Sequence, residues 1–123
     1  RGTSAETLAE AFAAFCAQNR LAPQCITAAA SIDLKQNEAG LLAFCRGCGW
    51  PVQFFTAEQL RAAPGSFTPS AFVQSVTGVD NVCERSAVLA AGGTLVFHKY
   101  AYTGVTFALA VRPYAPDWRW QNV

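Results

Sequence analysis

The 123-residue chain is 52% apolar and only 14% charged, which suits one folded domain with an apolar core and excludes an intrinsically disordered chain. Nine Lys and Arg nearly balance eight Asp and Glu and are scattered singly, so we expect no nucleic-acid partner. No apolar stretch reaches the roughly 20 residues of a membrane-spanning helix, and no secretory signal is visible. We therefore expect a single domain over residues 1–123, with no membrane partner and a cytoplasmic location.

A helix, a strand and a polar loop are expected at the start of the chain. Thr3 and Glu6 have the spacing of a capping box, and apolar residues then recur at helical spacing, which predicts a helix over 4–18. Residues 25–32 are small or β-branched in a run too short for a typical helix, which predicts a buried strand. The polar residues 33–38 are expected to form a loop.

The following segments repeat the alternation of helix and strand. A second helix should end at Gly47 or Gly49, because glycine readily adopts the left-handed conformation that stops a helix. Residues 51–55 are typical of a strand. Thr56 and Gln59 again have capping-box spacing and predict a short helix.

Two more helices are expected in the second half of the chain. Thr68 followed by Pro69 predicts the start of a helix that stops at Gly78. Asn81 and Glu84, at capping-box spacing, predict the next helix, which the glycines at 92–93 should end.

Two β-rich runs, 94–102 and 105–111, complete the predicted elements. Thr103 and Gly104 between them favour a hairpin or two adjacent strands, and the tail from about residue 113 has no clear assignment. The strand before Asp33 lacks the alternation of a half-exposed sheet, so helices should cover both faces. The expected fold class is α/β: a three-layer α/β/α sandwich with a mixed, mostly parallel sheet in a single domain.

Nothing in the sequence predicts a metal site or a cofactor. Cys45 and Cys48 have redox-motif spacing, but they close a helix, where the dipole does not favour a thiolate, so a structural role is the better interpretation. The single histidine, His98, cannot anchor a zinc site without cysteine ligands. Gly47 and Gly49 follow a helix and lack the strand and third glycine of a dinucleotide-binding motif.

Asp33, Lys35 and Glu38 are candidate substrate-binding residues. They follow a predicted strand and precede a helix, a place where open α/β sheets commonly bind ligands. The ammonium of Lys35 can pair with a ligand carboxylate. Two structural alternatives stay open, because a loop lysine is usually a solvated charge and Glu38 near a helix start also offsets the helix dipole.

Glu84 and Lys99 are further candidates. Glu84 can serve as a general base toward water, or simply as the acid of a capping box. Lys99 lies in a strand-like run, where it must face solvent or pair with a carboxylate, either Glu84 or an acid of the substrate. His98 points to the opposite face of that strand and is expected at the surface. Three tryptophans can stack on a flat ring or serve as core contacts: Trp50, Trp118 and Trp120.

Five blocks of residues, in order, resemble the CobE and CbiG C-terminal family of cobalamin biosynthesis. The blocks are Ser31-Ile32-Asp33-Leu34-Lys35 with Glu38 and Gly40-Leu41-Leu42; Phe54-Phe55 with Ala57-Glu58 and Leu60; Thr68-Pro69-Ser70; Gly78-Val79 with Val82, Glu84 and Ala87 to Gly92; and Lys99 with Val105-Thr106. The opening Arg1-Gly2 is similar to the end of the family's first strand, so we expect that strand to lie upstream of Arg1.

The resemblance implies a role with a precorrin at the ring-contraction stage, without a cofactor. Lys35 and Lys99 would hold the peripheral acids of this tetrapyrrole, with Asp33 and Glu38 beside them and Glu84 as base for water attack on a lactone, all around one pocket. CbiG-type proteins are cobalt-precorrin-5A hydrolases, which release acetaldehyde, whereas CobE resembles their C-terminal part alone. Three interpretations stay open: an enzyme, a non-catalytic carrier or assembly factor working with other pathway enzymes, and a structural module.

Overall fold

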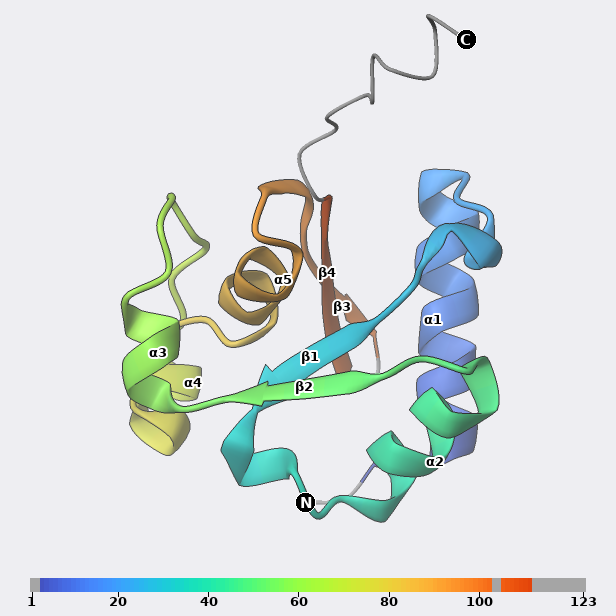
Figure 1. Ribbon diagram of the computed structural model, residues 1–123, viewed down its shortest axis with the longest axis horizontal. Helices are drawn as coiled ribbons and strands as arrows, with labels where there is room; N and C mark the ends of the chain where they lie inside the picture. Colours follow the sequence, from blue (N-terminus) through green and yellow to red (C-terminus); the bar gives the residue numbers. More distant parts are fainter. Residues whose placement is uncertain (1–2, 103–104, 112–123) are drawn as a thin grey trace, which may run out of the picture.

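The computed structural model describes residues 3–102 and 105–111, apart from the side chain of Phe72. In Figure 1, α1 and α2 lie at the right, α3, α4 and α5 at the left, and the strands between them. No helix in the described ranges is long and apolar enough to cross a membrane. The elements are α1 Ala5–Asn19, η1 Pro23–Cys25, β1 Ala29–Ile32, η2 Asp33–Lys35, α2 Ala39–Cys48, β2 Val52–Phe55, α3 Ala57–Arg61, α4 Ala71–Thr77, α5 Cys83–Ala91, β3 Thr94–Tyr102 and β4 Val105–Val111.

The described strands form two separate pairs. β1 runs parallel to β2 with Ala29 opposite Val52, and β3 runs antiparallel to β4 with Tyr102 opposite Val105. The α/β class is thus confirmed, and so are the two strands at the end of the described chain and their antiparallel pairing. The predicted single mixed sheet is not present among the described strands, because β1–β2 and β3–β4 share no ladder.

The helix expected over 4–18 is present as α1, but its predicted capping residue and the predicted start of the first strand were wrong. Helix α1 is capped by Ser4 rather than Thr3, because the Ser4 hydroxyl accepts a hydrogen bond from the Thr7 N–H at 3.1 Å. The expected strand over 25–32 is shortened to β1, since Pro23 opens the 3₁₀ turn η1. Proline fits that turn because its φ is fixed and it has no N–H to give to a strand ladder.

The caps of α3 and α4 show one prediction confirmed and one corrected. Thr56 and Gln59 form both bonds of the predicted capping box at the start of α3. Helix α4 is capped by Ser70 and not by Thr68, whose N–H and hydroxyl both bind elsewhere. Pro69 therefore lies before the helix and not in its first turn.

Two apolar clusters hold the elements together. The larger joins α1, α2 and the β3–β4 pair through aromatic contacts, such as Phe12 on Trp50 with ring centroids 5.1 Å apart. Trp50 thus serves as a core contact, while Trp118 and Trp120 lie outside the described residues. The smaller cluster contains Ile32 and Phe55, the last residues of β1 and β2. Each such buried side chain contributes roughly 1.5–3 kcal/mol, which fixes the point where the chain leaves β1 for the candidate loop.

Candidate functional site

The candidate loop begins at the carboxyl end of β1. Turn η2 starts directly after the fully buried Ile32. The Glu38 N–H then donates to the Lys35 carbonyl at 3.1 Å, and this turn brings the side chains of Lys35 and Glu38 close together. Lys35 Nζ lies 3.8 Å from Glu38 Oε2, and the side chains are 45% and 23% exposed. This ion pair is long and solvated, so little free energy is needed to exchange Glu38 for another anion.

Lys35 and Glu38 line a cavity of about 1130 Å³. Its walls include the strands β1 and β4 and the helices α1, α2, α4 and α5, and most of the lining is apolar. The segment that leads into α1 passes here as well, because Thr3 lines the cavity. A Cβ on Gly40 would clash with the Thr3 carbonyl oxygen, so glycine at this position of α2 permits the close approach of the two backbones.

Glu84 is fully buried at the start of α5 and holds three segments together. The Thr68 N–H donates to Oε1 at 2.8 Å, the Thr68 hydroxyl donates to Oε2 at 2.8 Å, and the Lys99 N–H donates to Oε2 at 2.6 Å. The carboxylate therefore joins the loop before α4 to strand β3. We call Thr68, Asn81, Glu84 and the Lys99 backbone the Glu84 clamp.

Asn81 completes the clamp and explains half of the predicted capping box. Its side-chain oxygen accepts from the Glu84 N–H at 2.8 Å, and its side-chain N–H donates to the Thr68 carbonyl at 2.8 Å. The Glu84 carboxylate, in contrast, does not return to the Asn81 N–H but turns to Thr68 and Lys99. The box is thus only half formed.

The clamp keeps Glu84 ionised at neutral pH. Burial by itself raises the pKa of this carboxyl, but hydrogen bonds from Thr68 and the Lys99 N–H, with a smaller effect of His98, lower it below its ordinary value. His98 Nδ1 is 3.6 Å from Oε2, and the imidazole is 67% exposed, as expected for a surface histidine. A carboxylate with a low pKa and both oxygens occupied is a poor acceptor for a proton from water.

A family model described as "Cobalamin synthesis G C-terminus" matches residues 1–110. This chain belongs to the CbiG C-terminal family. Cobalt-precorrin-5A hydrolase of Salmonella typhimurium is 34% identical over 111 residues, which cover 90% of this chain and 32% of that protein. The hydrolase of Priestia megaterium is 30% identical over 93% of this chain and 30% of its own length. The chain thus spans about a third of these curated relatives.

A solved structure supports the same assignment. The crystal structure of CobE, a protein from the cobalamin biosynthetic pathway, matches with a TM-score of 0.79 and 30% identity, covering 88% of this chain and 81% of that one. The resemblance predicted from the five blocks is therefore confirmed, and this chain is a cobalamin-biosynthesis domain of the CbiG C-terminal family.

The structure brings the candidate residues together in two groups and not around one pocket. Lys35 and Glu38 form one group at the cavity, with Asp33 two residues ahead of Lys35 in η2. Glu84 and Lys99 form the other, but through the Lys99 backbone N–H and not its ammonium. Neither Glu84 nor Lys99 is among the residues that line the cavity. Sequence reasoning missed Thr68 and Asn81 as hydrogen-bond partners of Glu84, because each residue also matches the pattern of a helix start.

All five cysteines of this CbiG-type domain are free thiols. Burial, followed by the neighbouring Cys48, raises the pKa of Cys45 to about 11, and burial raises that of Cys48 as well. Burial also raises the pKa of Cys83 to about 11, although Thr106 and Lys99 act in the opposite direction. Thiols of this kind are weak nucleophiles, which agrees with a structural role for Cys45 and Cys48. Within the described ranges, no cluster of three or more His, Cys, Asp or Glu could hold a metal ion.

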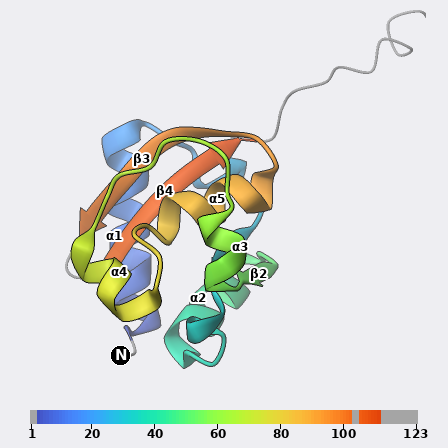
Figure 2. The ribbon, with the colours of Figure 1, turned by 90° about the vertical axis from the view of Figure 1, so that its left-hand side faces the viewer.

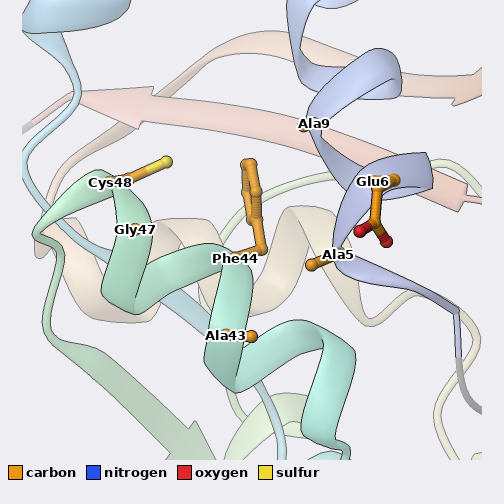
Figure 3. A pocket seen from close by; sticks show the side chains of 7 residues that line it. All are labelled: Ala5, Glu6, Ala9, Ala43, Phe44, Gly47 and Cys48. Atoms are coloured by element: carbon orange, nitrogen blue, oxygen red, sulfur yellow. The ribbon is translucent and has the colours of Figure 1, made fainter.

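A second hollow lies between α1 and α2, away from the candidate loop. It has a volume of about 340 Å³, and Figure 3 shows Ala5 and Ala9 of α1 and Phe44 of α2 among its lining residues. Glu6 and Cys48 are its polar members. This open, largely apolar surface brings no convergent polar groups to a ligand, so the loop at the end of β1 remains the better candidate.

Proposed function

We propose that this domain binds a precorrin through the loop Asp33–Glu38, and that it does so without hydrolysing it. The observation that carries the proposal is the Lys35–Glu38 pair, a half-exposed ammonium held at the carboxyl end of strand β1, directly after the buried Ile32. In α/β proteins, ligands bind at this end of the strands. Membership of a cobalamin-biosynthesis family gives the class of ligand, a ring with peripheral acetates and propionates.

The loop provides two kinds of contact to such a ring. Lys35 exchanges Glu38 for a peripheral carboxylate, and Leu34, 65% exposed between Asp33 and Lys35, offers apolar surface to the ring edge. Asp33 and Glu38 supply hydrogen-bond acceptors on either side. The proposal thus assigns the acids of the ligand to Lys35 and its apolar edge to Leu34.

Lys99 is proposed as a second cation for the same ligand. Its backbone binds Glu84, the residue after Cys83. Burial raises the pKa of Cys83, the charge of Lys99 acts against this larger effect, and Cys83 lines the same cavity as Lys35. The ion pairs between described residues do not include Lys99, so its charge is available to a ligand carboxylate. Two separated cations suit a ring with acids on several sides.

The Glu84 clamp favours binding over catalysis. A base for lactone opening needs access to water, and Glu84 is fully buried with both oxygens bonded to protein donors. The hydrolase relatives are about three times longer than the matched region, so their activity belongs to a larger protein. A carrier that passes the precorrin to other pathway enzymes is therefore our first proposal, and lactone hydrolysis is the alternative that the following experiment distinguishes.

The test is anaerobic titration of the domain with purified cobalt-precorrin-5A, followed by visible absorption and an assay for acetaldehyde. We expect a saturable spectral change without acetaldehyde, and about fivefold weaker binding for Lys35→Gln, which corresponds to loss of about 1 kcal/mol. Arg46→Gln, which removes an equally charged exposed side chain from the end of α2, is the matched control and should bind normally. No spectral change would overturn the proposal, and acetaldehyde release would select the hydrolase.

A further inference from the structure

Helix α4 is held at its two ends and packs little along its length. None of its described side chains is buried, and Val76 is 62% exposed. A helix of seven residues is too short to be stable by itself in water, because nucleation costs more free energy than so few hydrogen bonds return. The position of α4 is therefore set by the segments on either side of it.

The segment before α4 is fixed by the Glu84 clamp. Thr68 donates its N–H and its hydroxyl to the Glu84 carboxylate, and its carbonyl accepts a hydrogen bond from Asn81, each at 2.8 Å. Ser70, two residues later, caps α4. Pro69 between them has a fixed φ, so little rotation separates the anchored Thr68 from the first turn of the helix. The start of α4 is thus tied to Glu84.

The segment after α4 is also fixed. The carbonyl of Gly78, the C-cap residue, accepts a hydrogen bond from Arg61 Nη1 at 3.1 Å. Val79 follows with 1% of its surface exposed, in the same apolar cluster as Ile32, the residue that precedes the candidate loop. The end of α4 and the start of the loop Asp33–Glu38 are therefore anchored in one cluster.

The apolar side of α4 borders the cavity of the candidate site. Val73, Val76 and Thr77 line the same cavity as Lys35. Figures 1 and 2 show α4 and the turn between β1 and α2 at the same end of the domain. Leu34 and Val76 are the two most exposed large apolar side chains among the described residues, at 65% and 62%. The turn and the helix each present an uncovered apolar side chain at this end.

We propose that α4 is the second wall of the precorrin site: the ring lies between Leu34 and Val76 with an acid on Lys35, and Thr68 is a positioning residue for this wall. The inference rests on the proposed function and adds the side of the ring that the loop Asp33–Glu38 does not reach. Contact with both faces of a flat ring removes more apolar area from water than contact with one. The loose packing of α4 agrees with this role, since elements with few buried contacts are the ones that move when ligands bind.

Amide hydrogen exchange by NMR, with and without saturating cobalt-precorrin-5A under anaerobic conditions, tests whether α4 meets the ring. We expect the Gln74 and Gly78 amides, whose hydrogen bonds run along α4, and the Glu38 amide of the loop to exchange about tenfold more slowly in the complex. The change is measured relative to Leu60 of α3, outside the cavity lining, which corrects for global stabilisation by the ligand. Protection at Glu38 but not in α4 would overturn the second wall alone, and protection at neither would overturn the proposed function as well.

Two substitutions on α4 separate contact with the ring from the stability of the helix. Val76→Asn removes the apolar side chain and should weaken binding of cobalt-precorrin-5A about fivefold. Gln74→Asn, at an exposed position of α4 outside the cavity lining, introduces the same residue and should bind as the wild type does. Equal affinities of the two variants would overturn the contact, even if Lys35→Gln weakened binding as the proposed function expects.

A positioning role for Thr68 predicts a loss of affinity that lost stability does not explain. At a temperature where it is fully folded, Thr68→Val should bind about threefold more weakly and shift the visible absorption of the bound ring, because the second wall is no longer preorganised. Thr68→Ser keeps the hydroxyl bond to Glu84 and should restore both. Val88→Ala, which removes buried methyl groups of α5 outside the cavity lining, controls for stability and should bind normally. If Thr68→Val bound as tightly as Val88→Ala, the positioning role would be wrong.

Discussion

Glu38 and Glu84 occupy similar positions in this domain but have different surroundings. Glu38 is the N-cap residue of α2, and Glu84 lies in the first turn of α5. The Glu38 side chain is 23% exposed, and its ion pair with Lys35 spans 3.8 Å. Glu84 is 0% exposed and accepts hydrogen bonds from two N–H groups and a hydroxyl.

The difference separates a carboxylate that builds the protein from one that can meet a ligand. Burial of a charge is costly unless hydrogen bonds replace its hydration, so the three donors to Glu84 are a requirement of its position. Both Glu84 oxygens already bind protein donors, and the fully buried carboxylate is out of reach of a substrate. The Glu38 carboxylate keeps most of its capacity to accept hydrogen bonds from a ligand, because water still reaches it. The number of donors that the protein itself supplies, and not residue type or helix position, therefore distinguishes the two roles.

The largest expected effect follows from removal of the charge on Glu84. Glu84→Gln keeps the shape but points an amide N–H₂ at groups that already donate, so the free energy of unfolding should fall by about 3 kcal/mol or more. Urea denaturation measures this loss. Glu10→Gln, an exposed glutamate of α1, is the control and should change stability by less than about 0.5 kcal/mol. Equal stability of both variants would show that the clamp is not structural.

The same clamp predicts a loss of stability in acid. The pKa of Glu84 is lower in the folded protein than in the unfolded chain, so its contribution is complete above the ordinary glutamate pKa of about 4.3 and is lost as the pH falls through the lower folded value. Urea midpoints measured from pH 7 to pH 2.5 should therefore fall more steeply for the wild type than for Glu84→Gln. Parallel curves would contradict a depressed pKa.

A smaller effect is expected from the partner of Glu84. Thr68→Val removes the hydroxyl that donates to Oε2 and keeps the Thr68 N–H bond to Oε1, so it should cost about 2 kcal/mol, the usual value for a hydrogen bond to a charged group. Thr94→Val, at an exposed position of β3, removes a hydroxyl from the surface and should have little effect. If Thr68→Val matched this control, the backbone bonds alone would hold the clamp.

The contrast between the two glutamates also shows what the sequence can and cannot predict. Helix ends were predictable where the signal is local: Gly49 and Gly92 stop α2 and α5 in the left-handed conformation, and Thr56 caps α3. Thr68 has an equally good local signal, yet its hydroxyl binds Glu84, 16 residues later. Local patterns cannot reveal such a competition, because the distant acceptor is placed by the tertiary fold.

The candidate site was predictable in part for the same reason. Lys35 and Glu38 are three residues apart, so their contact follows from a turn that the polar loop already indicated. The Lys99 side chain was expected either to face solvent or to pair with Glu84 or an acid of the substrate. The structure shows a bond to Glu84 from the Lys99 backbone, which depends on the register of β3 with its partner. The family resemblance gave the function class, and long-range packing decided the role of each carboxylate.

The smallest expected effect completes the comparison. Glu38→Gln removes a negative charge near the N-terminus of α2 and a solvated ion pair, and each of these contributes at most about 1 kcal/mol. Its free energy of unfolding should therefore stay within about 1 kcal/mol of the wild type in the same urea experiment in which Glu84→Gln loses about three times as much. Glutamine keeps the length and most of the volume of glutamate in both variants, so the difference between them reports burial and donor number alone. A loss for Glu38→Gln as large as that for Glu84→Gln would mean that the loop after β1 is a structural element, and it would remove the basis for a ligand site there.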